Sequence, residues 1–206
     1  MNSLAKPTQE LIDDRMAHVR AMLARVRALT VNGVDRDSLE QIKVWMLELA
    51  SHRELFPIHE FPPIEGGNAS MYRLSEDPDH RYALYVVAPA PGGFAPPHDH
   101  DTWAVIAGIH GRENNKLYRR TDDGSRFGEA TVEQYGEVDV VAGTAVALMP
   151  SDIHSIHLGE DGPHANLHLY GMSVEHCYNR RMFSRSKNTY KIFPPATGIE
   201  KAHGAD

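Results

Sequence analysis

Hydrophobic residues recur at steps of three and four through the first third of the chain, which is the spacing of one face of an amphipathic α-helix. The first stripe begins after Pro7, with Thr8 as the predicted N-cap. A second helix is predicted from about residue 38 to 50 and stops before Pro57. We expect both stripes to pack into the core. They consist of Leu11, Met16, Val19, Met22 or Leu23, Val26 and Leu29 in the first helix, and Leu39, Ile42, Met46 and Leu49 in the second.

The pattern changes after residue 56. The stretch 56–67 is rich in proline and glycine, which interrupt a regular helix, so it is predicted to connect the helices to the remainder of the chain. Beyond it, short apolar or alternating runs are separated by Gly, Pro and Asp turns, a pattern that predicts a sandwich or barrel. The tail 202–206 is expected to be loose. The predicted strands cover residues 71–74, 82–88, 103–109, 116–120, 131–135, 144–148, 153–158 and 166–170.

Length and charge narrow the class of protein. A chain of 206 residues suits one domain with a sizeable core. Its formal net charge of −7 argues against nucleic acid as a partner, because phosphate binding needs clustered Lys and Arg. The one cysteine excludes an internal disulfide framework, and no run is long and apolar enough for a membrane span or a signal. We therefore expect a cytoplasmic enzyme acting on a small molecule, without a membrane partner.

Three histidines form the candidate chemical site. His98 and His100 are two residues apart, so on a strand both point to the same face, and His154 follows about fifty residues later. Imidazole is a common ligand of first-row divalent metals, and three such ligands leave positions open for substrate and dioxygen. The alternative is scattered histidines, since thirteen in the chain make chance pairs such as His154 and His157 common. Turn residues around the three favour the metal site: Gly92, Gly111, Gly143 and Pro150.

Over residues 82–170, these features resemble the two motifs of the cupin superfamily: a glycine before H-x-H and a later glycine, then P-x-D-x-H. The resemblance implies a mainly β fold, a cupin barrel (double-stranded β-helix or jelly roll) over 68–195, with N-terminal helices in 1–55 and a single domain over 1–206. Most cupins carry a glutamate four residues after the second histidine, where this chain has Ala104. It therefore resembles the smaller set of three-histidine cupins.

Within that set the chain resembles the thiol dioxygenases, the cysteine dioxygenase family with its bacterial relatives that act on 3-mercaptopropionate. The similar segments are His98-Asp99-His100 with Trp103, Asp152-Ile153-His154, and the row from Asn166 to Tyr170. The resemblance implies Fe(II) held by the three histidines, and oxidation of a small thiol by dioxygen to its sulfinate.

Asn166, His168 and Tyr170 are spaced two residues apart, so a strand would present all three on one face. A solvent-facing polar stripe is the alternative. By resemblance, Tyr170 would donate a hydrogen bond to bound dioxygen or substrate and His168 would orient its phenol. Asn166 replaces the family's serine and is expected to alter the substrate pocket. The animal enzymes link a cysteine to the tyrosine, but Ala104 aligns with that cysteine here, so no crosslink is expected.

A carboxylate-bearing substrate needs a cation, for which Arg offers a bidentate fork. By resemblance, the candidates are Arg180 or Arg181, as in the mercaptopropionate-type enzymes, and Arg73 or its neighbour Tyr72, as in the animal enzymes. Glu113 is not expected to bind the metal. His157 and His164 are expected to be loop or surface residues.

Other functions fit three histidines as well. Some three-histidine cupins are dioxygenases that cleave carbon–carbon bonds of β-diketones, although the Asn-x-His-x-Tyr row favours a thiol. A non-catalytic cupin would bind a ligand or a metal without turnover. Zinc is a further alternative to iron, because three histidines suit zinc and would support hydrolysis. Which thiol is oxidised, and the oligomeric state, stay open.

Overall fold

The computed structural model describes residues 6–63 and 69–205. The first helix, α1, spans Gln9–Leu29, and its cap is confirmed, because the Thr8 hydroxyl accepts a hydrogen bond from the backbone of Leu11. The second, α2, spans Arg36–Ser51, and it begins two residues before its predicted start because Asp35 caps it in a capping box. Both predicted apolar stripes are buried except Leu11, which is half-buried, and Leu29, which is exposed.

The predicted connector contains short helical turns where it is described. The 3₁₀ helices η1 (Arg53–Leu55) and η2 (Ile58–Glu60) come after α2. Residues 64–68, including Gly66 and Gly67, lie outside the described residues. The segment leads from the helices to the first strand.

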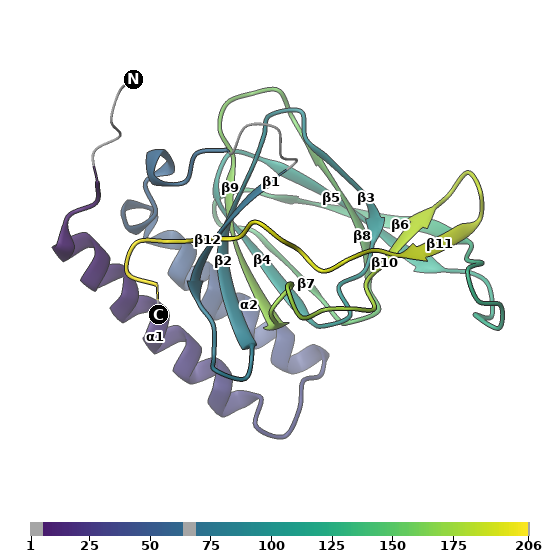
Figure 1. Cartoon of the computed structure of the whole chain (residues 1–206), viewed down its shortest axis with the longest axis horizontal. Helices are drawn as coiled ribbons and strands as arrows, with labels where there is room; N and C mark the ends of the chain where they lie inside the picture. The colour runs from purple at the N-terminus through teal and green to yellow at the C-terminus, as the bar shows by residue number, and fades with distance from the viewer. Residues whose placement is uncertain (1–5, 64–68, 206) are drawn as a thin grey trace.

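The rest of the chain forms two six-stranded sheets. One has the order β12-β1-β2-β9-β4-β7 and is called sheet A; the other has the order β11-β10-β3-β8-β5-β6 and is called sheet B (Figure 1). Every strand pair is antiparallel except β1 with β12. The strands are β1 (Ala69–Ser75), β2 (Arg81–Pro89), β3 (Phe94–His98), β4 (Ala104–His110), β5 (Glu113–Arg120), β6 (Val132–Val140), β7 (Ala145–Leu148), β8 (Ile153–Leu158), β9 (Ala165–Met172), β10 (Arg181–Ser184), β11 (Thr189–Ile192) and β12 (Glu200–Lys201).

The strand order defines the fold class. The strands β2 to β9 form two four-stranded groups, β2-β9-β4-β7 and β3-β8-β5-β6. In each group, strands distant in the sequence are neighbours, which is the arrangement of a jelly roll built from two Greek keys. The protein is therefore mainly β, a cupin barrel with N-terminal helices, as the sequence predicts.

Sequence patterns did not predict β3, β10, β11 or β12. In β3, Pro96 and Pro97 remove two backbone donors and weaken the strand signal. The strand forms because it pairs on one side with β8 and on the other with β10, with a register shift between Ala95 and His98. This irregular strand carries His98, so the missed element is one that positions the candidate site.

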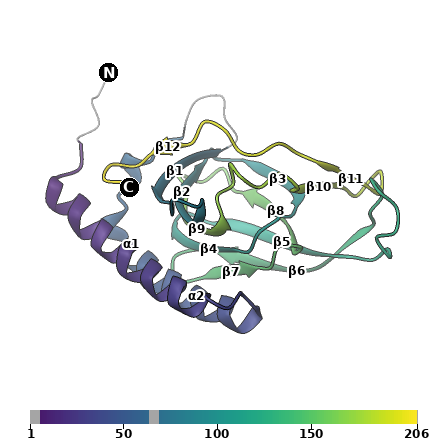
Figure 2. The same cartoon turned by 60° about the horizontal axis from the view of Figure 1, so that its bottom comes forward.

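The helices cover the outer face of sheet A (Figure 2). Side chains of α1 and α2 share one apolar cluster with alternate residues of β2, β4 and β9, such as Leu84, Val105 and Leu169. The opposite residues of these strands form a second cluster inside the barrel, which includes Tyr85 and Tyr170. This two-sided burial explains why β2 is a continuous apolar run.

The expectation of a loose C-terminal tail is wrong for residues 202–205. After β12 the chain returns to α1 (Figure 1), where Ala202 is buried and its backbone N–H donates to the carbonyl of Arg73. The buried guanidinium of Arg15 on α1 donates to the carbonyls of His203 and Leu55 and pairs with Glu60. A buried charge needs such partners, and the tail supplies one of the acceptors around Arg15.

Within the described residues, no helix is both long enough and apolar enough to cross a membrane.

Candidate metal centre

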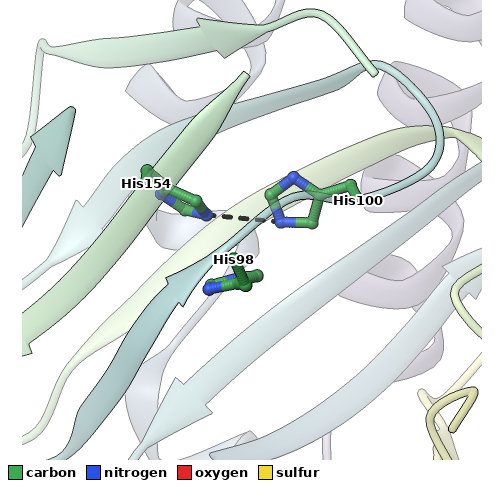
Figure 3. A group of neighbouring side chains, drawn as sticks. All are labelled: His98, His100 and His154. Atoms are coloured by element: carbon green, nitrogen blue, oxygen red, sulfur yellow. Dashed lines mark hydrogen bonds between the residues drawn. The ribbon is translucent and has the colours of Figure 1, made fainter. Parts of the chain in front are cut away.

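The structure brings the three predicted histidines together (Figure 3). His98 ends β3, His100 lies in the loop after it, and His154 is the cross-strand partner of His98 on β8. Their ring centroids lie 4.6 to 5.0 Å apart, and one nitrogen from each ring lies within 4.8 Å of the others. The Nε2 atoms of His100 and His154 are 3.3 Å apart. The described group contains no carboxylate, as Ala104 predicts.

Burial keeps these rings neutral. His100 and His154 are 3% and 0% exposed, and burial holds their pKa values well below the usual range for histidine. Desolvation likewise lowers the pKa of His98 to about 4. A neutral imidazole offers a nitrogen lone pair to a metal at neutral pH, so no proton has to be displaced from a charged ring. The donor set fits a divalent first-row metal ion with open coordination positions.

Hydrogen bonds set which nitrogen faces the centre. His98 donates from Nδ1 to the carbonyl of Pro96 at 2.8 Å, since a carbonyl can only accept. His154 Nδ1 lies 2.6 Å from Oδ1 of Asn115 and also donates. In both rings Nε2 is then the free donor to a metal. Nδ1 of His100 is buried and has no hydrogen-bond partner in the described part of the chain.

A buried carboxylate lies behind His154. Glu113 begins β5 and is 1% exposed, and its two carboxylate oxygens accept hydrogen bonds from Nδ2 of Asn115 at 2.9 Å and from Nδ2 of Asn166 at 2.8 Å. Burial raises the pKa of Glu113, and the two amide hydrogen bonds oppose that rise. Glu113 thus contacts amides and stands outside the three-histidine group.

The predicted row on β9 faces the barrel interior. Nδ1 of His168 lies 3.0 Å from the phenol oxygen of Tyr170, and the ring of Tyr170 lies 5.4 Å from that of His100. The side chain of Asn166 donates to Glu113 and so does not continue the hydrogen-bonded row of His168 and Tyr170. Burial raises the pKa of Tyr170 above its usual value and lowers that of His168 to about 3. Both groups are therefore neutral near pH 7. Ala104 is the cross-strand neighbour of Tyr170, and both belong to the apolar cluster inside the barrel.

The two candidate arginines at β10 have different surroundings. Arg180 is 8% exposed, its Nη2 donates to the carbonyl of Pro194 at 2.7 Å, and its guanidinium stacks over Phe193 at 4.3 Å. Its Nε is buried without a partner in the described residues, and burial lowers its pKa. The side chain of Arg181 instead forms an ion pair with Asp99, with 2.6 Å between Nε and Oδ2. Phe193 also lies 6.2 Å from the ring of His98, so Arg180 is next to the site.

The candidates on β1 are already engaged. Arg73 pairs with Glu76 and, at 2.7 Å, with Glu175. Tyr72 belongs to the cluster between the helices and sheet A, and its hydroxyl donates to the carbonyl of Pro62. Neighbouring residues on a strand face opposite ways, which places Tyr72 outside the barrel. The structure therefore does not bring Tyr72 together with the three histidines.

His164 lies in a loop, as the sequence predicts, but it is only 2% exposed, and its Nδ1 accepts from the backbone of Arg112 at 3.2 Å. His157 lies on β8 and is half-buried beside Ser155. Neither belongs to the three-histidine group.

Sequence reasoning missed Asn115 and Phe193. Asn115 is fully buried and contacts His154, although it lies on a strand of mostly polar residues. Its two-residue spacing from Glu113 was the available signal, since alternation points both side chains to the same face. No pattern indicated Phe193, because its position depends on how the C-terminal segment crosses the barrel.

No protein-family model and no curated protein sequence matches the chain. Among solved structures, it is similar to a structure described as that of DMSP lyases (14% identity, 56% of this chain and 53% of that chain, TM-score 0.41). It is also similar to a Klebsiella pneumoniae protein with a double-stranded β-helix domain (14% identity, 57% of this chain and 88% of that chain, TM-score 0.40). A third similar structure is a Ralstonia eutropha protein of unknown function with a cupin-like fold (16% identity, 61% of this chain and 64% of that chain, TM-score 0.39). The chain spans about half the length of the first.

These TM-scores are too low to support an inference about activity, and the fold class rests on the strand order. Fold and site together define a cupin barrel with a candidate three-histidine metal centre.

Proposed function

We propose that the protein is a non-heme Fe(II) dioxygenase that converts a small carboxylate-bearing thiol and dioxygen to the sulfinate. The observation that carries the proposal is the three-histidine group beside the buried Tyr170–His168 pair. The overall reaction balances without a reductant, because both atoms of dioxygen enter the product: RSH and O₂ give RSO₂H.

The metal would be held by Nε2 of His98, His100 and His154. When bound, Fe(II) would supply adjacent positions for a thiolate and dioxygen and would lower the pKa of the thiol. The rings are neutral and two of them are oriented by hydrogen bonds from Nδ1, so the ligands are arranged before the metal arrives.

Tyr170 is proposed to donate a hydrogen bond toward substrate or dioxygen. A neutral His168 with its proton on Nδ1 donates to the phenol oxygen, which leaves the phenol hydrogen free to point into the site. The other tautomer would accept that hydrogen and remove the donor. His168 is thus a positioning residue for Tyr170, and the high pKa of the phenol keeps its proton in place.

Arg180 is proposed to bind the substrate carboxylate. It carries no hydrogen-bonded carboxylate in the described structure, and its Nε is buried without a partner, so an incoming anion would complete its hydrogen bonds. Arg73 would have to leave Glu76 and Glu175 first. The sequence left the choice open, and these contacts favour Arg180.

The test is dioxygen uptake by the iron-loaded, untagged protein with cysteine, 3-mercaptopropionate, mercaptosuccinate and, as a non-thiol, acetylacetone. We expect uptake with a thiol and an equal amount of sulfinate. Uptake with acetylacetone alone would instead identify a β-diketone dioxygenase. Stoichiometric zinc in the purified protein, with no turnover after exchange for iron, would contradict the proposal.

A further inference from the structure

Glu113 and its two asparagines form a buried group that connects the two sheets. Glu113 and Asn115 are on β5 of sheet B, whereas Asn166 is on β9 of sheet A. All three side chains are 0 to 1% exposed. A carboxylate buried this deeply is costly unless its oxygens are hydrogen-bonded, and here each oxygen accepts from one amide.

The direction of every hydrogen bond in this group is set by the carboxylate. Because a carboxylate only accepts, both amides must present Nδ2 to Glu113. Turning Nδ2 of Asn115 toward Glu113 turns its Oδ1 toward His154, 2.6 Å from Nδ1 of that ring. An amide oxygen accepts as well, so His154 must donate from Nδ1. Its remaining nitrogen, Nε2, then carries the lone pair that faces the other histidines.

We propose that Glu113, acting through Asn115, is a positioning residue that holds His154 in the tautomer required for metal binding. The inference rests on the proposed function in one respect, namely that the three histidines bind a metal. It assigns Asn166 a different task from substrate contact: Asn166 holds the second oxygen of Glu113 and fixes the carboxylate across the sheets.

The position of Asn115 explains why an amide is needed between Glu113 and His154. Without an acceptor at Nδ1, the ring of His154 gains a hydrogen bond from the other tautomer, in which Nε2 donates to His100 3.3 Å away. That tautomer blocks the nitrogen that a metal needs. The amide of Asn115 removes this competition by accepting the proton at the opposite side of the ring.

Three variants test the relay. Asn115→Leu removes the acceptor while keeping the number and branching of the side-chain heavy atoms. Glu113→Gln presents one donor and one acceptor, so either Asn115 or Asn166 must turn, and Oδ1 of Asn115 stays held toward His154 only when Asn166 is the residue that turns. The double variant Glu113→Gln/Asn115→Asp restores every donor–acceptor match and the net charge, since the new carboxylate accepts from both the ring and Gln Nε2.

The matched control is Asn114→Leu. Asn114 is the neighbouring asparagine on β5, but its Nδ2 donates to Asp139, which is 41% exposed, so this change leaves the buried group intact.

The readouts are the ¹⁵N NMR shifts of the His154 ring in metal-free protein, which report the protonated nitrogen, and the affinity for Co²⁺ by chelator competition. We expect the Nδ1–H tautomer in the unaltered protein and in the control. We expect Nε2–H character and about 10- to 100-fold weaker Co²⁺ binding in Asn115→Leu, a smaller shift in Glu113→Gln, and recovery in the double variant.

An Nε2–H tautomer in the unaltered protein would overturn the relay even if the variants do not fold. Unchanged tautomer and affinity in Asn115→Leu would do the same. Failure of the metal proposal is distinguishable, because the unaltered protein would then not bind Co²⁺ while the ring shifts still report the tautomer.

Discussion

Asp99, which lies between two of the candidate ligands, is held by Arg181: its carboxylate accepts from the backbone N–H of Arg181 at 2.7 Å and from Nε at 2.6 Å. In return, the backbone N–H of Asp99 donates to the carbonyl of Arg181 at 3.0 Å. Asp99 follows the last residue of β3 and is 1% exposed, so its carboxylate is buried against Arg181. The pair thus fastens the ligand segment to β10.

Asp99→Asn should therefore loosen the site. The amide would present donors to the guanidinium of Arg181, and we expect the free energy of unfolding to fall by about 1–3 kcal/mol. Metal affinity should fall as well. Urea unfolding and chelator competition measure the two effects. Asp101→Asn is the control, since Asp101 is exposed, and it should change stability by less than about 0.5 kcal/mol. Equal effects of both variants would contradict a special role for Asp99.

His154→Ala should abolish stoichiometric binding of iron. The variant keeps only two of the three protein ligands, and the described group contains no carboxylate that could replace the lost one. His157→Ala, on the same strand, should bind metal normally. Metal content after dialysis against a weak chelator decides the matter. Full iron and full turnover in His154→Ala would remove that residue from the site, and His100→Ala should behave like His154→Ala.

Tyr170→Phe should keep the metal and lose rate. Removal of the phenol takes away the proposed hydrogen bond to the reacting atoms, for which a loss in kcat on the order of 10²-fold is typical. Tyr85→Phe is the matched control. The ring of Tyr85 lies 5.9 Å from that of Tyr170, but its hydroxyl donates to Ser173. Steady-state kinetics with the best thiol distinguish the two. Equal kcat in Tyr170→Phe and the unaltered protein would contradict the proposed role.

Arg180→Leu should raise KM for carboxylate-bearing thiols. A hydrogen bond between charged groups contributes about 1.5–3 kcal/mol, which corresponds to roughly 10- to 150-fold in KM. A thiol without a carboxylate should show little change. Arg73→Leu should affect stability more than KM, since Arg73 pairs with two carboxylates of the protein. If KM rises in Arg73→Leu and not in Arg180→Leu, the carboxylate contact belongs to β1.

The metal-free protein should lose stability in mild acid. Burial lowers the pKa of His168 from about 6.5 in the unfolded chain to about 3 in the fold, so the unfolded state binds more protons between these values. The contribution of His168 to the free energy of unfolding is complete above pH 6.5. Below that pH it falls by about 1.4 kcal/mol per pH unit, until the pKa of the folded state is reached.

Urea unfolding at pH 7 and pH 5, with a chelator present, measures this slope. His168→Gln should have a shallower slope than the unaltered protein, because one of the buried histidines no longer titrates. His157→Gln serves as the comparison, since His157 is only half-buried. Identical slopes in the unaltered protein and His168→Gln would show that folding does not lower the pKa of His168.

Much of the fold and of the candidate site is predictable from the amino-acid sequence alone. Periodicity identified both helices and eight of the strands, because burial of one face repeats at 3.6 or 2 residues whatever the partner is. The H-x-H spacing and the later His154 predicted the ligand group, and alternation predicted that Asn166, His168 and Tyr170 share a face. These are local regularities, and they are readable along the chain.

Tertiary contacts set what lies opposite each face. β3 forms despite two prolines because β8 and β10 flank that strand. Tyr72 packs with the helices, Arg180 lies beside Phe193, and His164 is buried in a loop. These outcomes depend on contacts between segments distant in the sequence, which periodicity does not encode. The hydrogen bond of His154 to Asn115 is of the same kind, since it joins side chains from two neighbouring strands that are 39 residues apart in the chain.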